Sequence, residues 1–199
     1  MDMNSMNGRP VRLALFVTGG GTNCENIIRY FRYNDSVDIP IVVSSRADAF
    51  ALVRAERLGV PTKVITRQEL NEEPELVLRT VEGCDFIILA GFLPKVPQYL
   101  IERFPNRIIN IHPALLPKFG GKGMWGHHVH EAVKAAGETR SGITIHFVNA
   151  ELDEGEHIAQ FSCELSPDDT PEQIADKVHE LEMRHFPMVI EQVIKNNIQ

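Results

Sequence analysis

The chain has 199 residues, of which 43% are hydrophobic and 24% are charged, a composition typical of one globular domain spanning residues 1–199 and not of disordered or fibrous proteins. Its formal net charge of -7 gives no general attraction to nucleic acid. Three cysteines without a CxxC pair, an N-terminus without a signal-peptide core, and no run of roughly 20 apolar residues predict a cytoplasmic protein with no membrane partner.

A strand, a glycine-rich loop and a helix open the chain. Residues 13–17 form an apolar run, residues 19–23 are small and polar, and Ile27, Ile28 and Phe31 then recur at helical spacing. A second strand over residues 41–43 precedes a helix predicted over 47–58, which Gly59 ends. Residues 60–65 follow as a third short strand.

The alternation continues through the middle of the chain. Residues 75–81 and 98–104 are predicted helices, and residues 86–90 form an unbroken apolar run typical of a central strand covered on both faces. Residues 107–112 form the next strand, which Pro113 ends. This order predicts an α/β fold with a doubly wound, mostly parallel sheet that binds ligands beyond the carboxyl ends of its strands.

The last third has a different pattern. Ile143, Ile145 and Phe147 alternate with polar residues, and a second extended segment follows over residues 158–165. We expect these to be added strands, with antiparallel pairing the favoured arrangement. From Pro171 a long amphipathic helix is predicted to run to the end of the chain.

The loop Gly19-Gly20-Gly21-Thr22-Asn23 joins a strand to a helix N-terminus. Free amide groups and the positive end of the helix dipole favour a phosphate there. A tight turn with Thr22 or Asn23 capping the helix explains the same residues equally well, because neither dinucleotide nor Walker spacing is present.

Asn110 and His112 lie two residues apart at a strand end, so their side chains point to the same side. An amide donor and a histidine together serve acyl transfer, by stabilising an oxyanion and moving a proton. Spacing alone favours the simpler interpretation, in which both satisfy nearby backbone. The acidic residues among 151–156 could supply a carboxylate partner for a histidine. Alternatively, they form a solvated acidic turn.

Two further segments remain ambiguous. His127, His128 and His130 lack the spacing of a zinc site, so we predict a helix-face or surface role and no required metal. Residues 119–126, rich in glycine and containing Trp125, are typical either of a lid over a ligand or of a surface loop.

Taken together these stretches resemble the phosphoribosylglycinamide formyltransferase family of folate-dependent enzymes. The likeness covers residues 13–193 and rests on Gly19 to Asn23, on Leu89-Ala90-Gly91-Phe92-Leu93, on the segment from Asn110 to Lys118, and on Gly142 to Val148 followed by Leu152-Asp153. The string Asn-Ile-His-Pro-x-Leu-Leu-Pro, at Asn110 to Pro117, is the most specific of these.

The resemblance implies 10-formyltetrahydrofolate as co-substrate and 5'-phosphoribosylglycinamide as acceptor, both small molecules, in a monomer or homodimer. It implies that Asn110, His112 and Asp153 are catalytic, with His146 in a supporting position. Gly21, Thr22 and Asn23 would bind the substrate phosphate and Glu182 the ribose. The folate would be held largely by backbone, at Leu93, Pro94, Lys95, Val96, Asn110, Asn149, Ala150, Glu151, Leu152 and Asp153.

The family commonly has an arginine in the region spanning residues 67–79, where this chain is shorter, so the resemblance assigns no particular arginine there. Two rivals share the Asn-x-His-Pro chemistry: methionyl-tRNA formyltransferase, which is longer and has a tRNA-binding domain, and formyltetrahydrofolate deformylase, which has an N-terminal regulatory domain. A non-catalytic phosphosugar or folate binding protein is the remaining alternative.

Overall fold

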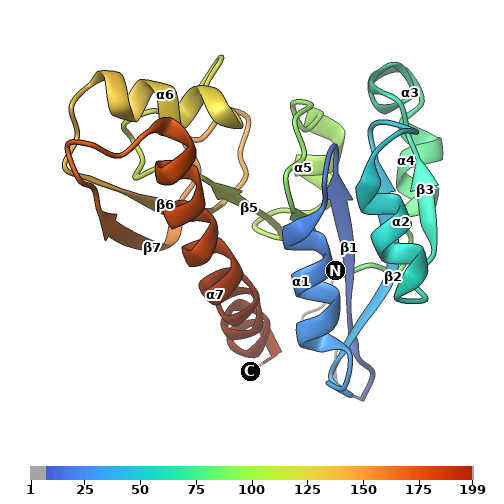
Figure 1. Ribbon diagram of the computed structural model, residues 1–199. Coiled ribbons are helices and arrows are strands. Elements are labelled where there is room, and N and C mark those ends of the chain that lie inside the picture. Colours follow the sequence, from blue (N-terminus) through green and yellow to red (C-terminus); the bar gives the residue numbers. More distant parts are fainter. Residues whose placement is uncertain (1–7, 199) are drawn as a thin grey trace.

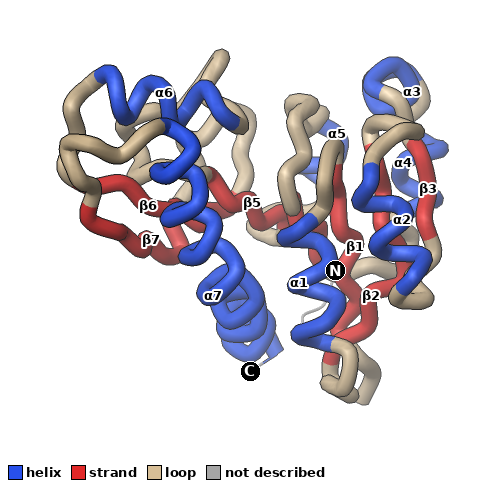
Figure 2. Tube along the Cα trace, in the orientation of Figure 1, coloured by secondary structure: helices blue, strands red, loops and turns tan. Residues whose placement is uncertain are grey.

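Seven strands form one continuous sheet in the part of the chain that the computed structural model describes, residues 8–198 (Figures 1 and 2). Its strand order is β3-β2-β1-β4-β5-β6-β7; β1 to β5 run parallel, whereas β6 pairs antiparallel with both of its neighbours. The mostly parallel sheet and the antiparallel added strands are therefore confirmed. The strands are β1 (Val11–Val17), β2 (Val37–Ser44), β3 (Thr62–Val64), β4 (Phe86–Leu89), β5 (Ile108–His112), β6 (Arg140–Phe147) and β7 (His157–Glu164).

Helices cover both faces of the sheet, as Figure 1 shows. One face packs against α1, α2, α6 and α7, and the other against α3, α4 and α5. The helices are α1 (Thr22–Phe31), α2 (Phe50–Arg57), α3 (Arg67–Glu72), α4 (Pro74–Thr80), α5 (Gln98–Arg103), α6 (His127–Ala135) and α7 (Pro171–Ile198).

The central strands β1 and β4 are largely apolar because each buries both of its faces. In β1, Leu13 and Leu15 point into one core, whereas Ala14 and Phe16 point into the other. All four residues of β4 are buried, and β4 is the fourth strand of the seven. The prediction of a central strand here is confirmed.

The helices differ from the predictions mainly at the start of α2 and in the presence of α3. Helix α2 begins at Phe50 and not at residue 47, because the Ser44 hydroxyl bonds both the N–H and the carbonyl of Arg46 and holds residues 44–46 in a turn. Helix α3 was not predicted at all. It begins with a capping box in which Thr66 and Glu69 bond each other's backbone N–H.

Gly59 has a φ of 79° directly after α2, as its predicted role at the helix end requires. The N-terminal segment considered as a signal peptide, residues 1–7, lies outside the described residues. Within residues 8–198 none of the helices has the length and apolar character needed to cross a membrane.

Candidate active site

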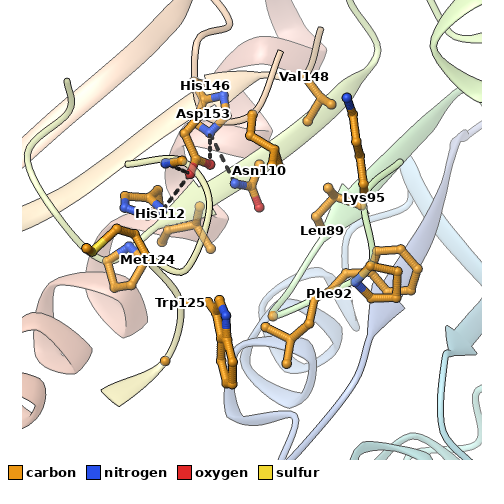
Figure 3. Close-up of a pocket in the computed structure, with 18 of the residues that line it drawn as sticks. Leu89, Phe92, Lys95, Asn110, His112, Met124, Trp125, His146, Val148 and Asp153 are labelled. Atoms are coloured by element: carbon orange, nitrogen blue, oxygen red, sulfur yellow. Dashed lines mark hydrogen bonds and ion pairs between the residues drawn. The ribbon is translucent and has the colours of Figure 1, made fainter. Parts of the chain in front are cut away.

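A cavity of about 730 Å³ lies beyond the carboxyl ends of β4 and β5, where a parallel sheet is expected to bind ligands. It is bounded by the loop after β4, the loop after β5, residues 149–153 and the N-terminal half of α7. This volume is in the range of about 300–1,000 Å³ that suits small-molecule ligands. Figure 3 shows the side chains that face into it.

Asn110 and His146 meet across the junction between β5 and β6. The antiparallel register places the two residues opposite each other, and Asn110 Nδ2 lies 3.1 Å from His146 Nε2 (Figure 3). His146 Nδ1 lies 2.9 Å from the Phe147 carbonyl, which can only accept, so Nδ1 carries the ring proton and Nε2 accepts from Asn110. One Asn110 N–H is thereby fixed, and the second remains to donate to a ligand.

His112 lies at the end of β5 and is only 4% exposed. Its Nε2 is 2.7 Å from the Phe119 carbonyl, and its Nδ1 is 3.6 Å from Asp153 Oδ2. Burial lowers the pKa of His112 below its ordinary value of 6.5, although the Asp153 carboxylate and the Phe119 carbonyl act in the opposite direction. This direction favours the neutral imidazole at pH 7, and Asp153 reduces the cost of protonating it.

Asp153 stands between the two histidines. Its Oδ1 is 3.7 Å from His146 Nε2, and its Oδ2 accepts the Gly121 N–H at 2.9 Å. Burial on its own would raise the pKa of Asp153, but the contacts with His146, His112 and Gly121 outweigh it and hold the pKa below the ordinary range. Asp153 is therefore a carboxylate with its charge directed at His112.

At the opposite end of the cavity, the start of α1 contacts α7. Asn23 Nδ2 donates to Glu182 Oε2 at 2.8 Å, and His179 Nδ1 lies 3.1 Å from the same oxygen. The hydrogen bond to Glu182 raises the pKa of His179, although burial opposes it. This end of the cavity thus combines amide, imidazole and carboxylate groups at hydrogen-bonding distance.

The start of α1 carries no side-chain cap, because its N-cap residue is Gly21. The alternative in which Thr22 or Asn23 caps the helix is therefore wrong, because Asn23 bonds Glu182 of α7 instead. Gly21 has a φ of 78°, and a Cβ there would lie 2.4 Å from that of Ala51, so no larger residue fits. Within residues 8–198 no side chain caps the first-turn N–H groups, as an anion site requires.

Thr18 ties the loop after β1 to the loop after β4. Its buried hydroxyl lies 2.8 Å from Ser45 Oγ and accepts the Leu93 N–H at 3.0 Å. Three neighbouring strand ends, those of β1, β2 and β4, are therefore joined through one hydroxyl group. Thr18 is not among the predicted site residues, although it is the last buried residue before the glycine-rich loop.

Most predicted site residues line this one cavity, but three do not. Gly21, Thr22 and Ala150 are not among its lining residues, and Thr22 is exposed at the start of α1. Arg67 and Lys95 do line it, and both are exposed cations. The predicted residues that line the cavity are Asn23, Leu93, Pro94, Lys95, Val96, Asn110, His112, His146, Asn149, Glu151, Leu152, Asp153 and Glu182.

His127, His128 and His130 differ in their surroundings. The first two are exposed on α6 near Glu131, whereas His130 is buried, lines the cavity and has no partner for Nδ1 among the described residues. Burial lowers the pKa of His130, although Glu182 opposes this. No group of three or more His, Cys, Asp or Glu residues suited to a metal ion occurs within residues 8–198.

Comparison with known proteins agrees with this geometry. The family model for formyl transferase matches residues 11–190. A chloroplastic phosphoribosylglycinamide formyltransferase of Arabidopsis thaliana is 38% identical over all of this chain and 70% of its own length, and the Haemophilus influenzae phosphoribosylglycinamide formyltransferase is 32% identical over 90% of this chain and 85% of its own.

A solved structure is equally similar. The phosphoribosylglycinamide formyltransferase of Anaplasma phagocytophilum superposes with a TM-score of 0.84 at 32% identity, covering 94% of this chain and 88% of that one. Both the match along the sequence and the shared three-dimensional arrangement extend over nearly the whole chain. The chain therefore belongs to the formyl transferase family.

Proposed function

We propose that the protein transfers the formyl group of 10-formyltetrahydrofolate to the amine of 5'-phosphoribosylglycinamide, a step of de novo purine biosynthesis. One observation carries this proposal: Asn110, His112 and Asp153 meet in the middle of a cavity whose two ends have different chemistry. One end has the Asn23–Glu182 pair beside the uncapped N-terminus of α1. The other end is lined by two loops, residues 93–96 and 149–153, whose backbone groups can form hydrogen bonds. The middle suits acyl transfer, and the ends suit two different substrates.

The reaction forms one C–N bond and breaks another. The substrate amine attacks the formyl carbon, the bond from that carbon to N10 of the folate breaks, and one proton moves from the amine to N10. The free N–H of Asn110 donates to the oxyanion of the tetrahedral intermediate. His112 takes up the proton, and the charge of Asp153 stabilises the imidazolium that forms.

The phosphosugar binds where α1 meets α7. Its phosphate lies against the free N–H groups of Gly21, Thr22 and Asn23, where the helix dipole favours an anion. Glu182 accepts from the ribose hydroxyls, because its carboxylate already faces the cavity beside Asn23. Glu25, the acidic residue of the first turn of α1, is paired with Arg29 and Arg54, so it opposes the phosphate little.

The folate lies between residues 93–96 and residues 149–153, which bound the opposite side of the cavity. The pterin takes its hydrogen bonds from their backbone. Arg67, and not Arg79, lines the cavity, and its side chain extends from the N-terminus of α3. We assign Arg67 to a carboxylate of the folate tail. It would then be the arginine that the family commonly has in this region and that the resemblance alone does not identify.

The setting proposed for this reaction is the cytoplasm, with a single domain over residues 1–199 acting on small molecules as a monomer or homodimer. Cys24, Cys84 and Cys163 are all free thiols, which suits a reducing compartment. Neither nucleic acid nor membrane is a proposed partner.

The deciding experiment offers three acceptors to the purified protein with 10-formyltetrahydrofolate: 5'-phosphoribosylglycinamide, methionyl-tRNA and water. Formylated product, identified by mass spectrometry, is expected only with the phosphoribosyl amine. Rapid formate release without an amine would indicate a formyltetrahydrofolate deformylase, and formylated tRNA would indicate a methionyl-tRNA formyltransferase. Binding of either small molecule without any turnover would support the non-catalytic alternative.

A further inference from the structure

The main chain of residues 119–121, here called the clip, contacts both members of the His112–Asp153 pair. The Phe119 carbonyl oxygen accepts from His112 Nε2 at 2.7 Å, and the Gly121 N–H donates to Asp153 Oδ2 at 2.9 Å. The proposed function above uses neither contact. Both come from a loop that the sequence indicates only as glycine-rich.

The clip is held in a conformation that few residues adopt. Phe119 has a φ of 57°, which is costly for a bulky residue, and Gly121 has a φ of 84°. A Cβ at Gly120 would lie 2.5 Å from Leu116 Cδ2 and 3.3 Å from Asp153 Cβ. A side chain at Gly120 would therefore require Leu116 to shift and would press against Asp153, so the main chain of the clip packs close to this residue.

The segment that leads into the clip is fixed from β6 and β7. Thr144 Oγ1 donates to the Ala114 carbonyl at 2.7 Å and accepts the Leu116 N–H at 3.0 Å. Gln160 Nε2 donates to the Leu116 carbonyl at 2.9 Å. The position of the Phe119 carbonyl is thus set by the sheet, and this is the condition for a backbone group to act as a precise positioning element.

Two acceptors compete for the single ring proton of neutral His112. The Phe119 carbonyl faces Nε2 at 2.7 Å, whereas the Asp153 carboxylate faces Nδ1 at 3.6 Å, beyond hydrogen-bonding distance. The shorter contact keeps the proton on Nε2 and leaves Nδ1 unprotonated beside the Asp153 carboxylate. Without the Phe119 carbonyl, Asp153 would be the remaining acceptor, and the proton would move to Nδ1.

We propose that the clip positions His112 for proton transfer by holding its ring proton on Nε2, so that Nδ1 is the nitrogen that exchanges the proton of the reaction. As the amine nitrogen bonds to the formyl carbon, its proton moves to Nδ1 and forms an imidazolium paired with Asp153. The same proton then passes to N10 as the bond from N10 to the formyl carbon breaks. This role in turnover rests on the proposed function, whereas the position of the ring proton does not.

The first test locates the ring proton directly. The chain has eight histidines, so nitrogen-15 NMR of the labelled protein is assigned with a His112→Gln variant. At pH 8 the His112 ring is expected to carry its proton on Nε2. A proton on Nδ1 in the wild-type protein would overturn the proposal, whether or not the protein transfers a formyl group.

The second test disturbs the clip. Gly121→Ala strains a residue at φ 84°, and Gly137→Ala, at φ 64° with open space around it and outside the cavity lining, is the matched control. Gly121→Ala is expected to move the proton to Nδ1 and to lower kcat on the order of tenfold to a hundredfold, with the KM for the amine within about threefold. Gly137→Ala is expected to do neither. An Nε2 proton retained in Gly121→Ala would refute the role of the clip.

Discussion

Removing the charge of Asp153 while keeping its shape tests the proposed catalytic pair of His112 and Asp153 directly. Asp153→Asn retains an oxygen that accepts the Gly121 N–H, so the local fold is expected to survive. The substitution removes the negative charge that lies 3.6 Å from His112 Nδ1. Because His112 becomes an imidazolium only during the reaction, the loss is expected in the transition state and not in substrate binding.

The size of the effect follows from that distance. With an effective dielectric constant of about 20, two unit charges 3.6 Å apart interact by about 4–5 kcal/mol. The full interaction would correspond to a loss of about 10³-fold in rate, and a partly formed charge reduces the loss to on the order of 10²–10³-fold in kcat. The pKa of His112, already lowered by burial, would fall further because Asp153 is the main group raising it.

Formyl transfer is followed by the absorbance change of the folate, with kcat and KM measured for both substrates across pH. Asp35→Asn, which removes an exposed carboxylate from the loop between α1 and β2, is the matched control. Urea unfolding of both variants checks that the fold is retained. A kcat of Asp153→Asn within about threefold of the wild-type value would show that the carboxylate does not stabilise a charge on His112.

Three further predictions concern other parts of the site. Asn110→Ala removes an oxyanion donor and is expected to lower kcat about 100-fold or more, and unchanged kinetics would exclude it from the reaction. Thr18→Val leaves the Leu93 N–H without its acceptor, so the KM for the folate should rise about 5- to 30-fold. Thr18→Ser keeps the hydroxyl, so its KM should stay within about threefold of the wild-type value. Equal KM values for the two variants would contradict this role of Thr18. Arg67→Gln should raise the same KM about tenfold or more, as expected for the loss of a hydrogen bond to a charged group worth about 1.5–3 kcal/mol. Arg79→Gln, outside the cavity lining, should leave that KM unchanged, and matching effects of the two variants would remove Arg67 from the folate site.

The order of the elements could be predicted because burial leaves a periodic pattern in the sequence. The strands β1 and β4 are apolar on both faces, and α7 repeats apolar residues at helical spacing. Helix α3 was missed since it buries only Leu70 and depends on the Thr66 and Glu69 capping box, a local signal with no periodicity. The start of α2 was misplaced for the same reason, because a side chain, Ser44, competes for the backbone there.

The proposed catalytic residues were predictable to different degrees. Asn110 and His112 could be paired from spacing alone, because a strand projects alternate residues to one side. Asp153 could not, since its place depends on how the turn after β6 folds back. A Cβ at Gly155 would lie 1.6 Å from the Phe147 carbonyl, and Asp153 itself has a φ of 58°. Only the family resemblance singled out Asp153 among the acidic residues of that turn.

The contacts of the loop after β5 could not be predicted from the sequence. Its glycines are compatible with a mobile lid, and composition offers no way to distinguish that from a fixed support. The groups that approach His112 and Asp153 from this loop are a carbonyl and an N–H, and every residue except proline supplies both. What singles out Phe119 and Gly121 is where the bonds from Thr144 and Gln160 hold the preceding turn, and those bonds cross from β6 and β7. The position of the ring proton on His112 thus depends on β6 and β7, two strands that follow His112 much later in the sequence.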